Sequence, residues 1–220
     1  MSQGADILQM RAIEIPRAGI VGDLTAPAAA KGIVLFAHGT GSSRFSSRNR
    51  SVARALNDSG LATLLLDLLT PEEDAMDQRS RQFRFDIARL AERLVQATEW
   101  IRDNAETAHS PVGYFGASTG AAAALIAAAD LPDIVCAVVS RGGRPDLAGP
   151  DLLEIKAPTL LIAGERDYPV IKLNETALNQ LRCEKRLEII PDATHLFEEP
   201  GALEEVTRLA SGWFQRYLPS

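Results

Sequence analysis

Apolar positions along this chain follow two patterns: short continuous runs, and stripes with helical spacing between them. Short runs that are apolar at nearly every position are typical of strands buried on both faces of a sheet. Five such runs predict interior strands, at 32–37, 61–66, 111–116, 134–139 and 158–163. A more mixed run at 185–190 predicts a strand nearer an edge, and the segments 10–15 and 18–24 predict a hairpin at the opposite edge.

The segments between these runs predict helices. In 81–103, Ile87, Leu90, Leu94 and Ile101 fall on one stripe while arginines face away. Further helices are predicted at 48–58, 119–130, 170–181 and 201–217. Regular strand–helix alternation predicts an α/β fold with a mostly parallel central sheet, right-handed crossovers and helices on both faces. Ligands of such sheets bind beyond the carboxyl ends of the strands, so functional residues are sought there.

Composition narrows the class of protein. The 220 residues are 46% hydrophobic and 24% charged, which fits a globular protein of one domain, 1–220, and excludes a disordered chain or a membrane bundle. A net charge of −6 argues against nucleic acid or an anionic membrane as partner. The first sixteen residues have no basic stretch leading into an apolar one, so a cytoplasmic location is expected. The composition leaves the oligomeric state open.

The chemistry is predicted to centre on Gly116-Ala117-Ser118-Thr119-Gly120. This G-x-S-x-G pattern follows an apolar strand and opens an apolar helix, the context in which it holds a nucleophilic serine. Glycines are needed because side chains at those positions would collide with the neighbouring backbone of a sharp turn. The alternative interpretation is a serine that caps a helix in a glycine turn.

A serine nucleophile needs a base and an orienting carboxylate. With this motif the order along the chain is serine, acid, histidine, and only His195 of the three histidines follows Ser118. His195 comes just after the strand at 185–190, although a surface-loop histidine is the alternative. Asp167 lies at the carboxyl end of another strand and is the predicted acid, with Glu165 as second choice. The alternative for Asp167 is a helix cap.

The turn at 38–44 is predicted to supply the first oxyanion donor. Its glycines present backbone N–H groups toward the nucleophile, and the Thr40 amide is the candidate. The second donor is the amide of Thr119, the residue after the serine. His38 is expected to brace the turn. A phosphate-binding interpretation of this turn lacks both G-x-x-x-x-G-K-[ST] and G-x-G-x-x-G.

Together these residues resemble the α/β-hydrolase superfamily from 32 to the last helix. The segments 164–167 and 193–197 look like its dienelactone-hydrolase-like branch. That branch typically has a cysteine nucleophile, and Ser118 in its place favours a serine-esterase reaction over dienelactone cleavage. The segments 38–44, 48–50 and 140–144 resemble a bacterial subgroup in which some members are fused to a phosphoribosyltransferase domain. We expect no such domain in this chain.

The loops bear on the substrate. Only about 18 residues separate the strands at 134–139 and 158–163, too few for a helical cap. The acidic segment 70–80 can form a rim but not a hydrophobic lid, and an open site suits small esters. Arg44 and Arg141 are candidates for binding an anionic substrate group. The alternative is structural, with Arg141 paired to a carboxylate such as Asp146.

The sequence therefore predicts a serine hydrolase that cleaves carboxylic esters of small or short-chain acyl groups through an acyl-enzyme, with a small-molecule ester as its partner. Ser118, His195 and Asp167 would form the triad, and the amides of Thr40 and Thr119 the oxyanion hole. No metal or cofactor is expected. An acyltransferase, lactonase or thioesterase would use the same triad. A non-enzymatic ligand- or phosphate-binding module on this fold is the alternative outside enzymes.

Overall fold

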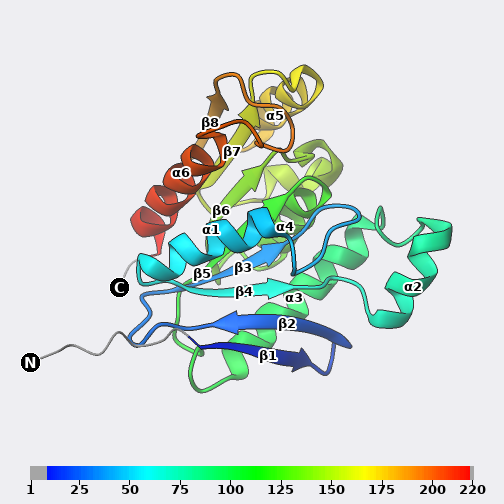
Figure 1. Ribbon diagram of the computed structural model, residues 1–220, viewed down its shortest axis with the longest axis vertical. Coiled ribbons are helices and arrows are strands. Elements are labelled where there is room, and N and C mark those ends of the chain that lie inside the picture. The colour runs from blue at the N-terminus through cyan, green and yellow to red at the C-terminus, as the bar shows by residue number, and fades with distance from the viewer. Residues whose placement is uncertain (1–8, 219–220) are drawn as a thin grey trace, which may run out of the picture.

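The structure is a computed structural model, and it describes residues 9–218. Its eight strands form one sheet in the order β1-β2-β4-β3-β5-β6-β7-β8 (Figure 1). The strands are β1 (Met10–Ile15), β2 (Ile20–Thr25), β3 (Ile33–Ala37), β4 (Ala62–Leu66), β5 (Val112–Ala117), β6 (Val135–Arg141), β7 (Thr159–Gly164) and β8 (Lys185–Ile190). β1 and β2 form an antiparallel hairpin, β2 pairs antiparallel with β4, and every pair from β4 to β8 is parallel.

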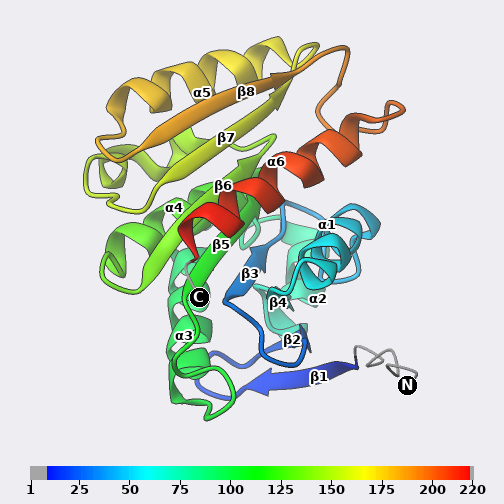
Figure 2. The same ribbon diagram turned by 90° about the vertical axis from the view of Figure 1, so that its left-hand side faces the viewer.

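Helices cover both faces of this sheet, as Figure 2 shows. They are α1 (Ser47–Asp58), α2 (Pro71–Ser80), α3 (Ile87–Asp103), α4 (Thr119–Asp130), α5 (Tyr168–Gln180) and α6 (Ala202–Tyr217), with a 3₁₀ segment η1 (Pro145–Leu153). One apolar core packs α3, α4 and α5 on one face, and a second packs α1 and α6 on the other. No helix within 9–218 has the length and apolar character needed to cross a membrane.

The predicted fold class is confirmed. β3, β4, β5 and β7 are buried along their whole length, and β6 is buried except at Cys136, as expected from their continuous apolar runs. The connection from β6 to β7 holds only η1, so no large cap domain is inserted there. The parallel order from β4 to β8 brings the carboxyl ends of β3, β5, β6, β7 and β8 to one edge of the sheet.

One local prediction was wrong. The helix predicted from 81 begins at Ile87, because Asp86 caps it by accepting the Arg89 amide. The sequence predicts no secondary structure for the acidic segment that can form a rim. That segment folds as the helix α2, which begins with a capping box: Thr70 accepts the Glu73 amide and Glu73 accepts the Thr70 amide. Thr-Pro-x-Glu carries that signal in the sequence, although no apolar stripe follows it.

Helix α2 projects from the body of the molecule (Figure 1) and is attached to it by charges. The buried residues among its ten are two acids, Glu73 and Asp77. Glu73 Oε1 accepts from Arg89 at 2.6 Å and from Arg93 at 3.2 Å, both on α3. Asp77 pairs with Arg84 and also accepts the Arg84 amide at 3.0 Å. Ion pairs and hydrogen bonds therefore hold α2 in place, without a buried apolar side chain.

This attachment makes α2 acid-sensitive. Burial acts to raise the pKa of Glu73 and Asp77, but the Thr70 amide, Arg89 and Arg84 outweigh it and each pKa lies below its usual value. Carboxyls with a depressed folded pKa stabilise the fold above their unfolded pKa of about 4, and this contribution is lost as the pH falls through the folded pKa.

We therefore expect hydrogen exchange of the α2 amides, corrected for intrinsic rates, to accelerate below about pH 4 before that of α4. Glu73→Gln should produce the same local loss of protection at neutral pH. If α2 and α4 lose protection together, the ion pairs do not hold α2 separately from the core.

Candidate active site

A strained turn carries Ser118 from β5 into α4. Its backbone has φ 51° and ψ −123°, a conformation that non-glycine residues rarely adopt. A Cβ on Gly116 would lie 2.4 Å from the Ala121 Cα, and one on Gly120 would lie 2.3 Å from the Ala37 carbonyl oxygen. The two flanking glycines are therefore required by close backbone contacts, as the sequence pattern implies.

His195 and Asp167 meet at this edge of the sheet. Nδ1 of His195 lies 2.6 Å from Oδ2 of Asp167, although the two residues are 28 positions apart. The Asp167 side chain is 13% exposed and the imidazole 41% exposed, so the carboxylate is the more enclosed partner. With Nδ1 engaged, Nε2 is the ring nitrogen left to exchange a proton.

Backbone contacts between the loops after β7 and β8 fix this pair. A Cβ on Gly164 would lie 2.4 Å from the Ala193 carbonyl oxygen, and the Arg166 amide donates to that same oxygen at 2.9 Å. Glu165, the second-choice acid, accepts the Asp192 amide at 2.8 Å and so ties the histidine loop to β7. Gly164 is a site residue that sequence reasoning missed, because its neighbour lies in a distant loop.

The Ser118 turn and the histidine loop share a neighbour in the end of β6. The Ser118 amide donates to the Arg141 carbonyl at 3.2 Å. A Cβ on Gly142, the next residue, would lie 3.5 Å from Cε1 of His195 and 3.3 Å from the Phe197 ring. The structure thus brings Ser118, His195 and Asp167 to one place above the sheet.

The turn after β3 also reaches this place. A Cβ on Gly39 would lie 2.8 Å from the Cβ of Ser118. The Thr40 amide, the predicted oxyanion donor, donates to Oγ1 of Thr119 at 3.0 Å, and the two threonine hydroxyls lie 2.9 Å apart. Thr40 and Thr119 are therefore adjacent, with the Thr119 hydroxyl accepting the Thr40 amide.

His38 braces the turn from beneath. The Leu68 amide donates to its Nε2 at 3.3 Å, so its proton sits on Nδ1, which donates to the Gly39 carbonyl at 3.0 Å. Burial lowers the pKa of His38, with Asp67 and Asp74 opposing that shift. A neutral imidazole with both nitrogens bonded is a structural element of the turn.

The two candidate arginines lie in different surroundings. Arg44 pairs with Asp67 and, at 3.3 Å, with Asp23, and its own amide donates to Asp67. Arg141 is 8% exposed, and its guanidinium lies 5.8 Å from the centre of the Phe197 ring. Burial lowers the pKa of Arg141 to about 10.

The ion pair with Asp146 considered for Arg141 is made instead by Arg144, through two hydrogen bonds of 2.9 and 2.8 Å. Nη2 of Arg141 points to Oδ1 of Asn49, in the first turn of α1, at 3.5 Å. The Arg141 guanidinium therefore lies between α1 and the histidine loop.

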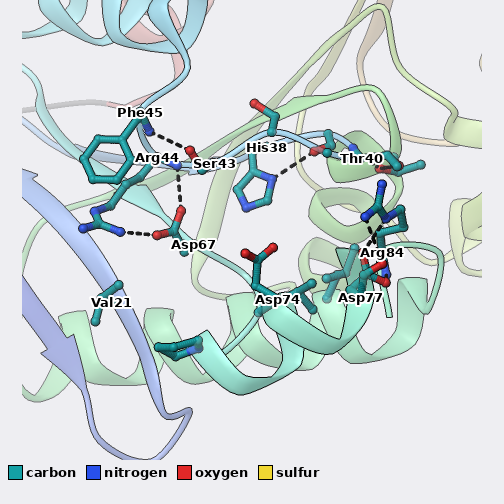
Figure 3. A pocket seen from close by; sticks show the side chains of 17 residues that line it. Val21, His38, Thr40, Ser43, Arg44, Phe45, Asp67, Asp74, Asp77 and Arg84 are labelled. Carbon is teal, nitrogen blue, oxygen red and sulfur yellow. Dashed lines mark hydrogen bonds and ion pairs between the residues drawn. The ribbon is translucent and has the colours of Figure 1, made fainter. Parts of the chain in front are cut away.

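A cavity of about 470 Å³ opens beside Thr40 and Thr119 (Figure 3). It lies between the 38–45 turn, α2 and the start of α3. Sequence reasoning predicted only that 70–80 can form a rim, and did not predict that this segment is a helix that forms a wall of the cavity. Within 9–218, His, Cys, Asp and Glu side chains do not gather in threes as they would around a metal ion.

An eight-stranded, mostly parallel sheet with a sharp serine turn after β5, and with an aspartate and a histidine after β7 and β8, defines an α/β-hydrolase. Residues 19–217 match the model of the dienelactone hydrolase family. The chain belongs to this family.

Solved structures agree with this assignment. A dienelactone hydrolase from Anabaena variabilis is 60% identical, with a TM-score of 0.94 over 96% of this chain and 99% of that one. Est1E from Butyrivibrio proteoclasticus shares the fold alone, at 15% identity and a TM-score of 0.78 over 94% of this chain and 98% of that one.

Proteins from two strains of Mycobacterium tuberculosis, each named "Putative phosphoribosyl transferase", are 56% identical over 90% of this chain. This chain spans 44% of their length.

From the close contact at Gly120 we predict the effect of a substitution on the free energy of unfolding. Gly120→Ala places a methyl group against the Ala37 carbonyl and should lower the free energy of unfolding by about 1–3 kcal/mol. Gly212→Ala is the matched control: this helical glycine has open space around its Cβ position, and the change should stabilise the protein by about 0.5–1 kcal/mol. Chemical denaturation measures both, and equal effects would contradict the packing argument.

Proposed function

We propose that this protein hydrolyses carboxylic esters of small or short-chain acyl groups through an acyl-enzyme on Ser118. The observation that carries the proposal is the 2.6 Å contact between His195 and Asp167 beside a serine held in a strained turn. Membership of a hydrolase family supports it. A binding module has no need for a strained backbone at Ser118, whereas such strain is common at catalytic sites.

In this proposal His195 Nε2 takes the proton of the Ser118 hydroxyl as Oγ attacks the acyl carbon. Asp167 holds the imidazole in the Nδ1–H tautomer and stabilises its charged form. The protonated His195 then passes its proton to the leaving alcohol as the ester bond breaks. Water, activated by His195, attacks the acyl-enzyme, releases the acid and restores Ser118.

The oxyanion would lie between the amides of Thr119 and Thr40. Thr119 opens α4, so its amide has no acceptor inside the helix and lies at the positive end of the helix dipole. The Thr40 amide donates to the Thr119 hydroxyl in this structure. We propose that the substrate oxygen replaces that hydroxyl as the acceptor, so the donor is already oriented before substrate binds.

A modest cavity and the lack of an inserted cap domain support small or short acyl groups. Acyl transfer, lactone cleavage and thioester cleavage would use the same groups. For the Mycobacterium tuberculosis proteins, we propose that the transferase activity in their name belongs to the part of their length that this chain does not match.

The contacts favour the structural interpretation for Arg44 but not for Arg141. The guanidinium of Arg44 is engaged by Asp67 and Asp23. The guanidinium of Arg141 is buried beside the Phe197 ring, and its Nε and Nη1 have no hydrogen-bond partner within residues 9–218. These two donors are free for an anionic group of the substrate, so Arg141 stays a candidate substrate-binding residue.

A fluorophosphonate probe should attach to Ser118, because such probes react with an activated serine hydroxyl. Ser118→Ala should abolish both labelling, read by mass spectrometry, and the hydrolysis of p-nitrophenyl acetate. Its melting temperature should change little, because the hydroxyl makes no hydrogen bond within the described residues. Labelling at another residue, or full activity of the variant, would refute the proposal.

Asp167→Asn should leave the fold intact and lower kcat by roughly 10²–10⁴-fold, because the amide favours the wrong imidazole tautomer. Glu165→Gln is the control: it removes a carboxylate from the same loop, and its amide oxygen can still accept the Asp192 N–H. Steady-state kinetics on p-nitrophenyl esters measures both. A larger loss in Glu165→Gln would move the acid to Glu165.

A further inference from the structure

The cavity beside Thr40 and Thr119 is placed to receive the acyl chain of a substrate. The leaving alcohol must lie next to His195, because that residue has to protonate it. Neither His195 nor Ser118 lines the cavity, whereas Gly39, which lies against Ser118, and the two threonines Thr40 and Thr119 do. An acyl chain on Ser118 that points away from His195 would therefore pass the two threonines and extend toward α2.

Most charged groups of this cavity already have partners. Arg44 is paired with Asp67, and Arg84 with Asp77. The nearby His38 is neutral and both its ring nitrogens are bonded. Neither arginine therefore offers an open site for a substrate anion.

Asp74, on the cavity-facing side of α2, is the exception. Within residues 9–218 it forms no ion pair, and its recorded side-chain hydrogen bond comes from the exposed Gln78 amide at 3.1 Å. Figure 3 shows its carboxylate pointing across the cavity toward the His38 ring. An ionised carboxylate accepts several hydrogen bonds, so this one has capacity left for a ligand.

The charges of the residues that line the cavity favour a ligand group that donates hydrogen bonds. Three aspartates (Asp67, Asp74 and Asp77) face two arginines (Arg44 and Arg84), which leaves the lining with a net charge of −1. A carboxylate at the end of an acyl chain would meet repulsion here, whereas an ammonium or hydroxyl group would find an acceptor.

We propose that Asp74 is a specificity-determining residue that accepts a hydrogen bond from a donor group, an ammonium above all and a hydroxyl less strongly, at the far end of the acyl chain. The inference rests on the proposed ester hydrolysis, because it assigns the acyl side of that reaction. It places selection for the acyl group on α2, away from the elements that carry Ser118, Asp167 and His195.

The test uses p-nitrophenyl esters of trans-4-substituted cyclohexanecarboxylic acids, whose rigid ring prevents the substituent from attacking its own ester. The substituents are methyl, hydroxymethyl, aminomethyl and carboxylate. Wild-type kcat/KM should be highest for the aminomethyl ester, then hydroxymethyl, then methyl, and lowest for the carboxylate. Asp74→Asn should lower the ratio of aminomethyl to methyl kcat/KM by about three- to tenfold, since an exposed charged contact is partly screened.

Glu72→Gln is the matched control. It removes an acidic charge from the same turn of α2, but Glu72 does not line the cavity. Its substrate ratios should equal those of the wild type. An equal loss in both variants would show a long-range effect of charge and overturn the assignment of Asp74.

The assignment of Asp74 would also be overturned if wild-type kcat/KM is higher for the carboxylate ester, or equal for the methyl and aminomethyl esters. Fluorophosphonate labelling of Ser118 keeps the two proposals apart. If labelling fails in the wild type, the ester hydrolase proposal itself is wrong. If labelling persists while the ratios stay flat, only the role of Asp74 is refuted.

Discussion

The carbonyl oxygens of Ala37 and His38 lie so close to Gly120 that only a hydrogen atom fits there: a Cβ would come within 2.3 and 2.5 Å of them. This contact presses the start of α4 against the end of β3. It brings the turn that holds Thr40 beside Ser118, whose backbone has a positive φ. The proposed oxyanion donors and nucleophile depend on this single close approach, because each belongs to one of the two segments it joins.

A second close approach, at Gly164, serves the other half of the site. There the backbone of the loop after β7 touches the loop after β8, and hydrogen bonds from Arg166 and to Glu165 complete the connection. Asp167 and His195 lie on these two loops. Both halves of the site are thus held mainly by main-chain contacts, which keep side chains in place with little conformational freedom to lose.

The fold was largely predictable because its interior strands are buried on both faces and therefore apolar at nearly every position. Ser118, Asp167 and His195 could be predicted as a group because each comes where a strand ends. Helix α2 escaped the apolar pattern because its buried positions are Glu73 and Asp77, and only its capping box marked it. The hydrogen bond from the Thr40 amide to the Thr119 hydroxyl joins residues 79 positions apart. The spacing of residues within a motif cannot predict such a contact.

The ionic attachment of α2 has a consequence for how this fold can diversify. Its side chains do not belong to either apolar core, so changes along its exposed surface leave the packing under the sheet untouched. The glycines that flank Ser118 tolerate almost no change, whereas an exposed cavity residue such as Asp74 can change without disturbing the ion pairs that hold α2. Evolution or design could therefore alter the acyl selectivity proposed for α2 while the main-chain contacts around Ser118 stay unchanged.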